Sequence, residues 1–593
     1  MVAELERVGE ALDGMPTMLG RGSGVGSNAW VVDGDHSATG EPLLANDPHL
    51  GPSLPSVWYQ MGLHCNEVTE MCPFDVSGFT FAGFPGVVIG HNQEIAWGFT
   101  NLGPDVADLY LESVEGDRYL RGEEMRPLET REETIEIAGE EPFEFTVRSS
   151  VHGPLLSDVS QTYATVGANA PVEGKVPDRG NGYAVALSWT ALTPNRTAEA
   201  VFALNRATGW EEFREAAELF AAPSQNMVYA DRDGHIGYQA PGLIPVRRPG
   251  NDGDYPSAGW DRRNDWTGDF VPFDHLPSVL DPDDGFIVTA NQAVVGKDYT
   301  YYLGDSWAYG YRSQRIFDLV EKRGTLHPED MSAIQLDTHN GFAEVLVPYL
   351  LEVTPGLGYD AEGQALLETW DFTQPADSAA AAYYNVVWKN LLELTFGDEL
   401  PASVQPDGDA RWFEVVAGLL EEPNNRWWDD VDTEGIREGR DDILVQALQE
   451  ARDELTMRQS RRVDGWTWGH LHTLDLENQT VGQSDIGLVG RLLNRGPWEL
   501  GGGSSIVNAT GWNAAEGYEV DWVPSMRMVV SLADLDDSTW INLAGASGHA
   551  FHDNYTDQTE LWASGRTRAW PFTREAVEDA TTARLTLAPT SAD

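Results

Sequence analysis

The spacing of apolar and polar positions predicts strands at both ends of the chain and helices in its middle. Apolar residues recur at helical intervals in residues 1–20, 208–222, 311–322, 342–354, 379–396 and 441–457. Strand-like runs fill most of residues 27–113 and return over about 463–545, and residues 226–242 predict a β-hairpin around Asp-Arg-Asp-Gly. Because strands and helices do not alternate regularly, the pattern favours an α+β fold over a doubly wound parallel sheet.

Acidic residues dominate the charge of the chain. Its 593 residues include 95 Asp and Glu against 38 Lys and Arg, a formal net charge of -57, and the acidic residues are spread through the whole sequence. This composition lacks the clustered Lys and Arg that a nucleic-acid partner requires. Molar salt shortens the Debye length to about 3 Å and would screen the repulsion among so many like charges. We therefore expect a protein of a halophilic organism, with no nucleic-acid partner.

No stretch of the sequence resembles a membrane span, which requires roughly 18 or more consecutive apolar residues. The first residues, MVAELERVGEALDGMP, are acidic and amphipathic, and they lack the basic start and apolar run of a secretory signal. Cytoplasmic and exported locations in a high-salt organism both stay open.

The chain has two cysteines, Cys65 and Cys72, and they do not form the paired C-x-x-C pattern of a zinc site. We expect two buried thiols, with a single disulfide as the alternative. Neither arrangement indicates catalysis.

A glycine-rich tract, RGSGVGSNAWVV at residues 21–32, places Ser27 directly before an apolar strand. The tract lacks the ending of a phosphate loop, and the chain contains no G-x-S-x-G nucleophile elbow. A cut between Gly26 and Ser27 would give Ser27 a free α-amine beside its hydroxyl. Because an α-amine has a pKa of about 7.7 to 8.0, it could serve as the general base for that hydroxyl. Composition alone does not distinguish this Gly-Ser pair from the others.

Several ordered motifs resemble the penicillin acylase family of N-terminal-nucleophile hydrolases. They are GSNAWVV, GEPLLANDPHLG, FPGVVIGHNQEIAWGFTNLGPDVADLY, FIVTANQAV, AYGYRSQRI and NLAGASGHAFHDNYTDQTELWASG. The resemblance runs from about Gly22 to Phe572. It implies a four-layer α-β-β-α fold with a helical insertion at roughly 311–460, and a precursor that cuts itself before Ser27.

The resemblance also implies roles for individual residues. Ser27 would be the nucleophile and, through its amine, the base, while His49 would orient or hydrogen-bond it. The backbone N–H of Asn101 and the side chain of Asn291 would form the oxyanion hole, where one donor is worth about 3 kcal/mol. Arg312 would hold the Asn291 region or the substrate.

Two further sites follow from the resemblance. Apolar side chains would line an acyl pocket, namely Leu50, Ile89 and Phe99. Oxygen ligands would hold one structural calcium ion, namely Asp105, Ala107 through its carbonyl, Asp108, Pro245 through its carbonyl, and Asp305.

The family's precursor carries a sizeable α chain before the serine, whereas 26 residues precede Ser27 here. We therefore interpret residues 1–26 as a spacer or pro-segment removed by self-cleavage and residues 27–593 as a catalytic β chain. A separately encoded or upstream α chain would complete it. The expected activity is hydrolysis of a small N-acyl amide, such as a penicillin side chain or an N-acyl homoserine lactone. The alternative is an inactive truncated remnant or a non-catalytic binding protein.

Overall fold

The structure is a computed structural model that describes residues 26–587, apart from 173–175, 402–403, 432, 434, 481 and 483–486. The helix predicted over residues 1–20 lies outside the described residues. So does the proposed pro-segment, residues 1–26, except for its last residue, Gly26. No helix in the described part of the chain is both long enough and apolar enough to cross a bilayer.

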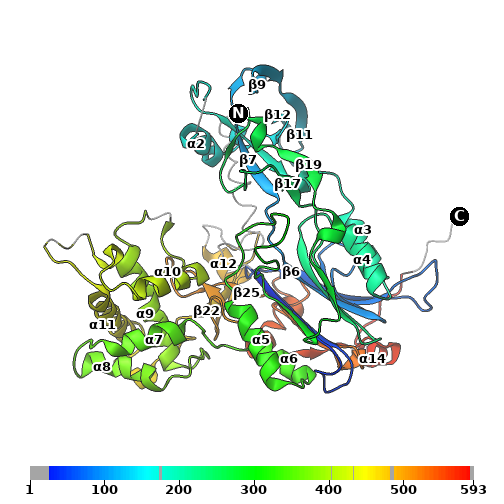
Figure 1. Cartoon of the computed structure of the whole chain (residues 1–593). Helices are drawn as coiled ribbons and strands as arrows, with labels where there is room; N and C mark the ends of the chain where they lie inside the picture. The colour runs from blue at the N-terminus through cyan, green and yellow to red at the C-terminus, as the bar shows by residue number, and fades with distance from the viewer. Residues whose placement is uncertain are drawn as a thin grey trace.

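Two large antiparallel sheets face each other in the centre of the molecule (Figure 1). The first sheet has the order β21-β1-β2-β26-β27-β28, with β25 beside β2 and β24 beside β25. Its strands are β1 (Gly26–Val32), β2 (Leu43–Leu50), β21 (Phe286–Thr289), β24 (Gly511–Trp512), β25 (Val520–Pro524), β26 (Met526–Ser531), β27 (Thr539–Asn542) and β28 (Arg568–Ala569). The second sheet has the order β20-β16-β15-β6-β5-β4-β3. Its strands are β3 (Trp58–His64), β4 (Asp75–Phe81), β5 (Ile89–Asn92), β6 (Ile95–Asn101), β15 (Gln225–Asp231), β16 (Ile236–Gln239) and β20 (Ser278–Leu280).

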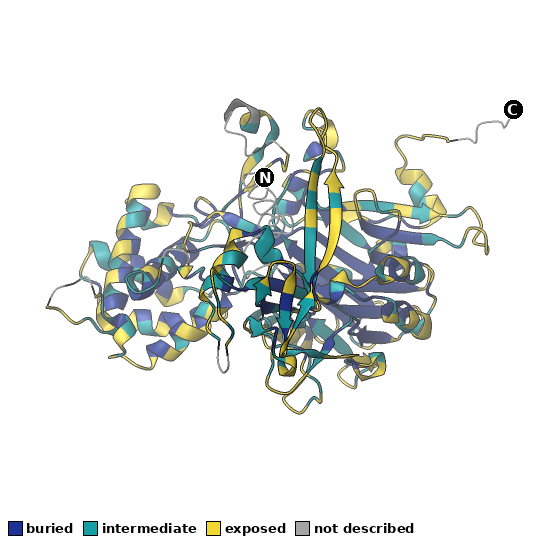
Figure 2. Cartoon of the chain, turned by 90° about the horizontal axis from the view of Figure 1, so that it is seen from above, coloured by how far each residue is buried: buried dark blue, intermediate teal, exposed yellow. Residues whose placement is uncertain are grey.

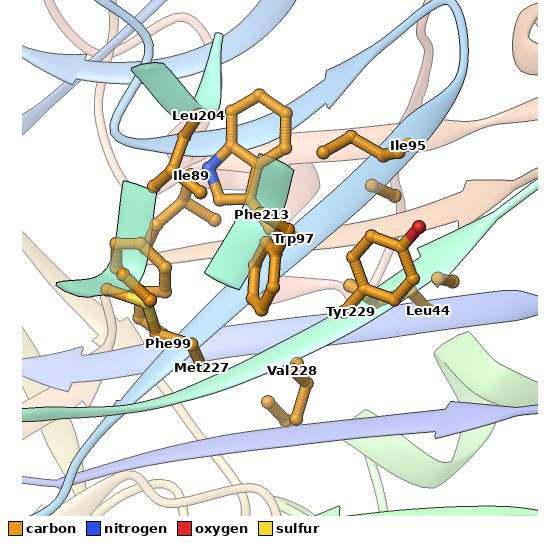
Figure 3. Close-up of a cluster of buried hydrophobic side chains, with 14 of the residues drawn as sticks. Leu44, Ile89, Ile95, Trp97, Phe99, Leu204, Phe213, Met227, Val228 and Tyr229 are labelled. Carbon is orange, nitrogen blue, oxygen red and sulfur yellow. The ribbon is translucent and has the colours of Figure 1, made fainter. Parts of the chain in front are cut away.

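Strand β1 is buried on both faces, which explains its uninterrupted apolar run. Side chains alternate along a strand, so Ala29 and Val31 face the second sheet and pack in the core that Figure 3 shows. Trp30 and Val32 point the opposite way and pack in a second cluster with residues of the covering helices. Ser27 shares the face of Ala29, so its position in the alternation directs its side chain toward the space between the sheets.

Helices cover the outer face of each sheet. The first sheet is covered by α5 (Tyr311–Arg323) and α6 (Pro328–Gln335), whose apolar residues pack against Trp30 and Val32. The second sheet is covered by α3 (Thr197–Leu204) and α4 (Trp210–Glu218), whose apolar residues join the central core. The predicted four-layer α-β-β-α arrangement of an α+β protein is thus confirmed (Figure 1).

A separate helical lobe follows these layers, at the left of Figure 1. Its helices are α7 (Ala343–Glu352), α8 (Tyr359–Gln364), α9 (Ala379–Phe396), α10 (Ala410–Leu420) and α11 (Arg440–Arg458). All of them except α8 contribute residues to a hydrophobic core of their own around Trp388 and Phe413. In Figure 2 their ribbons alternate between buried and exposed turns, as amphipathic helices do. The structure therefore divides the range 311–460 between a covering layer, α5 and α6, and this lobe.

A smaller lobe lies at the top of Figure 1 and consists mainly of short strands. It contains β7 (Ala107–Glu112), β8 (Val114–Glu115), β9 (Arg118–Arg121), β10 (Glu124–Pro127), β11 (Glu129–Ile135), β12 (Phe143–Ser150), β13 (Gly153–Pro154), α2 (Gln161–Asn169), β14 (Ala184–Trp189), β17 (Pro245–Arg247), β18 (Ser257–Ala258) and β19 (Trp266–Phe270). The remaining elements are β22 (Thr473–Leu476), α12 (Gly487–Leu493), β23 (Arg495–Glu499), α13 (Thr559–Ala563) and α14 (Arg574–Ala580).

The two cysteines form a disulfide, and the expectation of two buried thiols was wrong. A bridge between Thr69 and Cys72 turns the chain back after β3 and brings the Cα atoms of Cys65 and Cys72 to 5.9 Å. That separation suits a disulfide, and Cys72 is exposed.

Candidate active site

Ser27 lies where three strands meet. Strand β1 pairs with β2 on one side and with β21 on the other, and Ala29 lies opposite Thr289. Extending this antiparallel register by two residues brings Asn291 opposite Ser27. Strand β21 ends at Thr289, so in the described part of the chain no strand backbone pairs with Ser27 on this side. Instead the amide nitrogen of Ser27 donates a hydrogen bond to Oδ1 of the Asn291 side chain over 2.8 Å. Ser27 itself is 7% exposed.

Asn291 is held in an unusual backbone conformation. Its φ angle is 69°, in the left-handed region that Asn tolerates better than most residues. Its Oδ1 accepts hydrogen bonds from Ser27 and from Arg312 Nη2, the latter over 2.9 Å. Its Nδ2 donates to the carbonyl oxygen of Asn101 over 2.9 Å. An amide nitrogen carries two hydrogens, so Nδ2 retains a second donor for another acceptor.

Arg312 links Ser27 to Asn291. It is the second residue of α5, which begins directly after Gly310, whose φ angle of 87° allows the chain to enter the helix. Its Nη1 donates to the carbonyl oxygen of Ser27 over 2.8 Å and to Oδ1 of Asn28 over 2.7 Å. Burial lowers the pKa of Arg312 to about 10, which leaves the guanidinium charged at neutral pH. One fixed cation therefore holds both the strand and the asparagine.

Glycine at position 26 allows two side chains of the site to lie close to the backbone before Ser27. A Cβ atom on Gly26 would lie 2.7 Å from Oδ1 of Asn291 and 2.9 Å from Nη2 of Arg312. Real Cβ atoms do not approach other atoms so closely, so a larger residue would displace this pair. The bond between Gly26 and Ser27 thus lies against the same two side chains that hold Ser27.

Among the described residues, His49 does not make the direct hydrogen bond to Ser27 that was one of its two expected roles. It lies opposite Gly26 in the register. Its Nε2 instead lies 2.9 Å from Oδ2 of Asp47 and 3.2 Å from Nδ2 of Asn28. Burial lowers the pKa of His49 well below its usual value, so the ring is neutral. The alternation of strand β2 explains this, because Asp47 and His49 share the face that meets the helices.

A buried polar network under Ser27 was missed by the sequence reasoning. Asn28 Nδ2 donates to Oδ2 of Asp47 over 3.1 Å, and Gln335 Nε2 donates to its Oδ1 over 3.3 Å. Burial raises the pKa of Asp47 to about 8, although Arg527 opposes the rise. Through Asn28 this network reaches Arg312. The motif that contains His49 also contains Asp47, but it gives no sign of their contact.

Asn46 ties the two sheets together beside the site. Its Nδ2 donates to the carbonyl oxygens of Asn28 and Phe99 over 2.7 and 3.0 Å, and its Oδ1 accepts from the amide of Phe99 over 3.0 Å. A Cβ atom on Gly98 would lie 3.1 Å from this side chain, so the strands approach closely here. This connection fixes β6, and with it Asn101, relative to the strand that carries Ser27.

Asn101 ends strand β6 next to the site. Its carbonyl oxygen accepts hydrogen bonds from Nδ2 of Asn291 over 2.9 Å and from Nδ2 of Asn226 over 3.2 Å. The structure thus brings Asn101 to Asn291, and the contact it shows is through the carbonyl oxygen; the expected role of the Asn101 backbone N–H stays a prediction.

The three predicted pocket residues belong to one apolar cluster. Ile89 and Phe99 are 2% and 5% exposed, and Leu50 packs against the cluster while partly buried. Phe99, labelled in Figure 3, lies in this cluster. Its ring makes an edge contact with that of Phe220, with 5.9 Å between the ring centres. Phe99 and Gly98 alternate on β6, so Phe99 faces the helices while Gly98 faces the sheet of Ser27. Phe99 is therefore a residue of the hydrophobic core, on the face of β6 that is turned away from Ser27.

The predicted calcium ligands surround an arginine. Asp105 and Asp108 both form ion pairs with Arg247, at 2.8 and 2.7 Å. Pro245 begins the strand that carries this arginine, and Ala107 begins β7 between the two aspartates. Among the described residues no group of three or more His, Cys, Asp or Glu side chains is arranged to hold a metal ion. With a guanidinium already between the carboxylates, these residues do not fit a calcium ion. Asp305 is exposed and accepts a hydrogen bond from the neighbouring Ser306.

Comparisons with known proteins agree with this architecture. The family profile for penicillin amidase matches residues 2–579. The chain is 29% identical to acyl-homoserine lactone acylase QuiP of Pseudomonas aeruginosa, over 95% of this chain and 69% of that protein. It is 30% identical to penicillin acylase 2 proenzyme of Pseudomonas sp. strain SE83, over 95% and 69%.

A solved structure shares the fold. Thermostable penicillin G acylase from Alcaligenes faecalis superposes with a TM-score of 0.67 at 21% identity, over 95% of this chain and 100% of that chain. The profile match alone covers nearly the whole sequence. The chain therefore belongs to the penicillin amidase family and is an amidohydrolase.

Proposed function

We propose that the chain is an acylase whose nucleophile is Ser27, freed as the first residue by a cut after Gly26. The observation that carries this proposal is the hydrogen bond from the Ser27 nitrogen to Asn291 Oδ1, which Arg312 supports from its other side. Cleavage would turn that nitrogen into an amine without moving it. The base would then already lie in a fixed position beside its hydroxyl.

The cut itself uses groups on the same strand. The Ser27 Oγ attacks the carbonyl carbon of Gly26, the C–N bond breaks, and an ester joins the two residues while the nitrogen takes up a proton. Water then hydrolyses the ester, which leaves a carboxylate on Gly26 and restores the Ser27 hydroxyl. The tight packing of Gly26 against Asn291 and Arg312 holds the bond in place for this attack.

The mature enzyme would cleave amides by the same attack. The Ser27 amine accepts the hydroxyl proton, Oγ adds to the substrate carbonyl, and the second N–H of Asn291 Nδ2 together with the backbone N–H of Asn101 stabilises the oxyanion. The ammonium of Ser27 then protonates the leaving amine, and water hydrolyses the acyl ester. In this account His49 and Asp47 do not contact the substrate. They hold the side chain of Asn28 in place, and Asn28 in turn positions Arg312.

The substrate class we propose is a small N-acyl amide with an apolar acyl group. Two relatives carry names that specify such substrates, an acyl-homoserine lactone and a penicillin. The apolar Leu50, beside the cluster of Ile89 and Phe99, is consistent with an apolar acyl group. A separate α chain would complete the pocket, as the resemblance implies.

The test is product analysis in molar KCl. The chain, alone and with a family α chain, is incubated with a short-chain and a long-chain N-acyl homoserine lactone and with penicillin G. Chromatography with mass detection should find free acid and free amine in equal amounts, and none from a Ser27→Ala variant. If a chain shown to begin at Ser27 hydrolyses none of the three substrates in the presence of the α chain, the acylase proposal for these substrates fails. A non-catalytic binding role would then be the better account.

A further inference from the structure

Arg247 contacts two of the residues that the sequence predicts as calcium ligands, Asp105 and Asp108. The arginine lies on β17 and reaches across to the segment that enters β7. Its Nη2 lies 2.8 Å from Oδ1 of Asp105 and 2.7 Å from Oδ1 of Asp108. Its Nε donates to both oxygens of Asp108 over 3.2 Å, and its Nη1 donates to the carbonyl oxygen of Asp105 over 3.0 Å. One guanidinium therefore satisfies two carboxylates and a backbone carbonyl.

The surroundings complete this arrangement. Trp266 donates its indole N–H to Oδ2 of Asp108 over 2.7 Å, so both oxygens of that carboxylate have donors. The Arg247 side chain is 3% exposed and that of Asp108 is 2% exposed. A calcium ion requires six to eight oxygen ligands at about 2.3–2.6 Å. Here Oδ1 of Asp105 and both oxygens of Asp108 have nitrogen donors as partners, and such donors cannot coordinate a cation.

The loop that follows Arg247 closes over the same group. A Cβ atom on Gly253 would lie 2.5 Å from Oδ2 of Asp105, 2.6 Å from Oδ1 of Asp108 and 3.1 Å from Nε of Arg247. The φ angle of Gly253 is 88°, a conformation that favours glycine. The loop therefore packs directly on the arginine and the two carboxylates.

We propose that the Arg247 guanidinium replaces calcium as the cation that joins β7 to β17 in this member of the family. Two neighbouring carboxylates, one of them fully buried, require a positive charge between them. Arg247 supplies that charge from within the chain, with a planar set of donors that matches both acids. The group also anchors the segment between Asn101 and β7, where Asp105 donates its amide N–H to the carbonyl oxygen of Leu303 over 2.7 Å.

The proposal predicts stability that does not depend on calcium. The melting temperature of the wild-type chain is measured in molar KCl, with EGTA and with CaCl2 at constant ionic strength, and bound metal is measured by plasma mass spectrometry. We expect no retained calcium and no shift between the two conditions. Arg247→Ala should lower the melting temperature by about 5 °C, since it leaves buried carboxylates unpaired. Added calcium should then recover part of the loss, because the carboxylates are free. The control is Arg248→Ala, because Arg248 is exposed.

Two results would overturn the proposal. One is a wild-type chain that retains one calcium ion after dialysis or loses stability in EGTA. The other is an Arg247→Ala variant as stable as Arg248→Ala. If Arg247→Ala fails to fold, Arg247→Lys replaces it, since lysine keeps the charge with fewer donors. The melting temperature of Arg247→Lys should fall by less than about 5 °C and, like that of the wild type, should not change with EGTA. If Arg247→Lys requires calcium for stability, the proposal is contradicted.

Discussion

The backbone nitrogen of Ser27 and the side-chain oxygen of Asn291 are joined by a hydrogen bond of 2.8 Å across 264 positions of the sequence. This bond fixes the nitrogen that the proposed mechanism uses as its base. It also orients the amide group whose other end, Nδ2, is the proposed oxyanion donor. The Asn291 side chain thus fixes the position of the proposed base relative to the proposed oxyanion site, and Arg312 holds this side chain in place.

Replacement of Asn291 by alanine should therefore impair catalysis more than folding. Loss of one oxyanion donor typically lowers kcat by about 100- to 1000-fold, and loss of the contact to the amine adds to this. The measurement is kcat of chains produced with Ser27 as their first residue, so that slow self-cleavage does not obscure the result. Asn195→Ala is the control, because Asn195 is exposed. A variant within about threefold of the control would remove Asn291 from the oxyanion hole.

Replacement of Gly26 by alanine should slow the cut without harming the enzyme that the cut releases. The added Cβ would lie 2.7 Å from Oδ1 of Asn291 and push it away from Ser27. We expect the uncut chain to persist at least about tenfold longer, which corresponds to roughly 1.4 kcal/mol in the barrier. The fraction cut is followed by intact mass over time. Gly209→Ala is the matched control, since nothing lies within 4 Å of a Cβ there. Equal cleavage rates in the two variants would contradict the packing argument.

Asp47 should make the protein less stable as the pH rises. Burial raises the pKa of Asp47 to about 8 in the folded chain, whereas the pKa of an Asp in the unfolded chain is about 3.9. Between these values the folded state binds more protons than the unfolded state, so the free energy of unfolding falls as the pH increases. The groups that face this carboxyl are the neutral His49 and the two cations Arg312 and Arg527.

The measurement is the urea midpoint of the wild type and of Asp47→Asn from about pH 5 to pH 8. The wild type should lose stability relative to the variant across this window, and the exposed control Asp35→Asn should run parallel to the wild type. If the wild type instead gained on the variant with rising pH, Asp47 would be ionised and stabilised by its two arginines.

High salt should stabilise the chain because of its net charge of -57. An increase from about 0.1 to 1 M salt shortens the Debye length from roughly 10 to 3 Å and screens the repulsion. We expect the melting temperature to rise by on the order of 10 °C in KCl between these concentrations, and much less in sucrose of equal osmolality. A melting temperature independent of KCl would contradict the proposed adaptation to salt.

Local patterns in the sequence predicted five of the thirteen α-helices in the described part of the chain, namely α4, α5, α7, α9 and α11. The segment 379–396 coincides with α9, and 311–322 and 441–457 differ by one residue from the ends of α5 and α11. These helices are long and amphipathic or fully buried, so their period is clear. Six of the helices that were missed have at most eight residues, and two helical turns give little periodic signal; they are α3, α6, α8, α12, α13 and α14. Helices α2 and α10, with nine and eleven residues, were missed as well.

The contacts within the site could not be predicted, since they join residues far apart in the chain. The motif resemblance placed Ser27 and Asn291 in one site, but their hydrogen bond follows from the register between β1 and β21. The partner of His49 proved to be Asp47, two residues away on the same strand face. The role of Arg247 could not be predicted, because nothing in its local sequence shows that it contacts Asp108, which is 139 positions away in the sequence and on a strand of another sheet.

The most direct test of the account is the mass of the chain after expression in molar KCl, compared with that of Ser27→Ala. We predict that the wild type loses residues 1–26 and begins Ser-Asn-Ala-Trp, while the variant keeps its full length. Cleavage of the variant at the same bond, or a folded wild-type chain that stays uncut with the α chain supplied, would contradict the central claim that Ser27 is a nucleophile freed by its own attack.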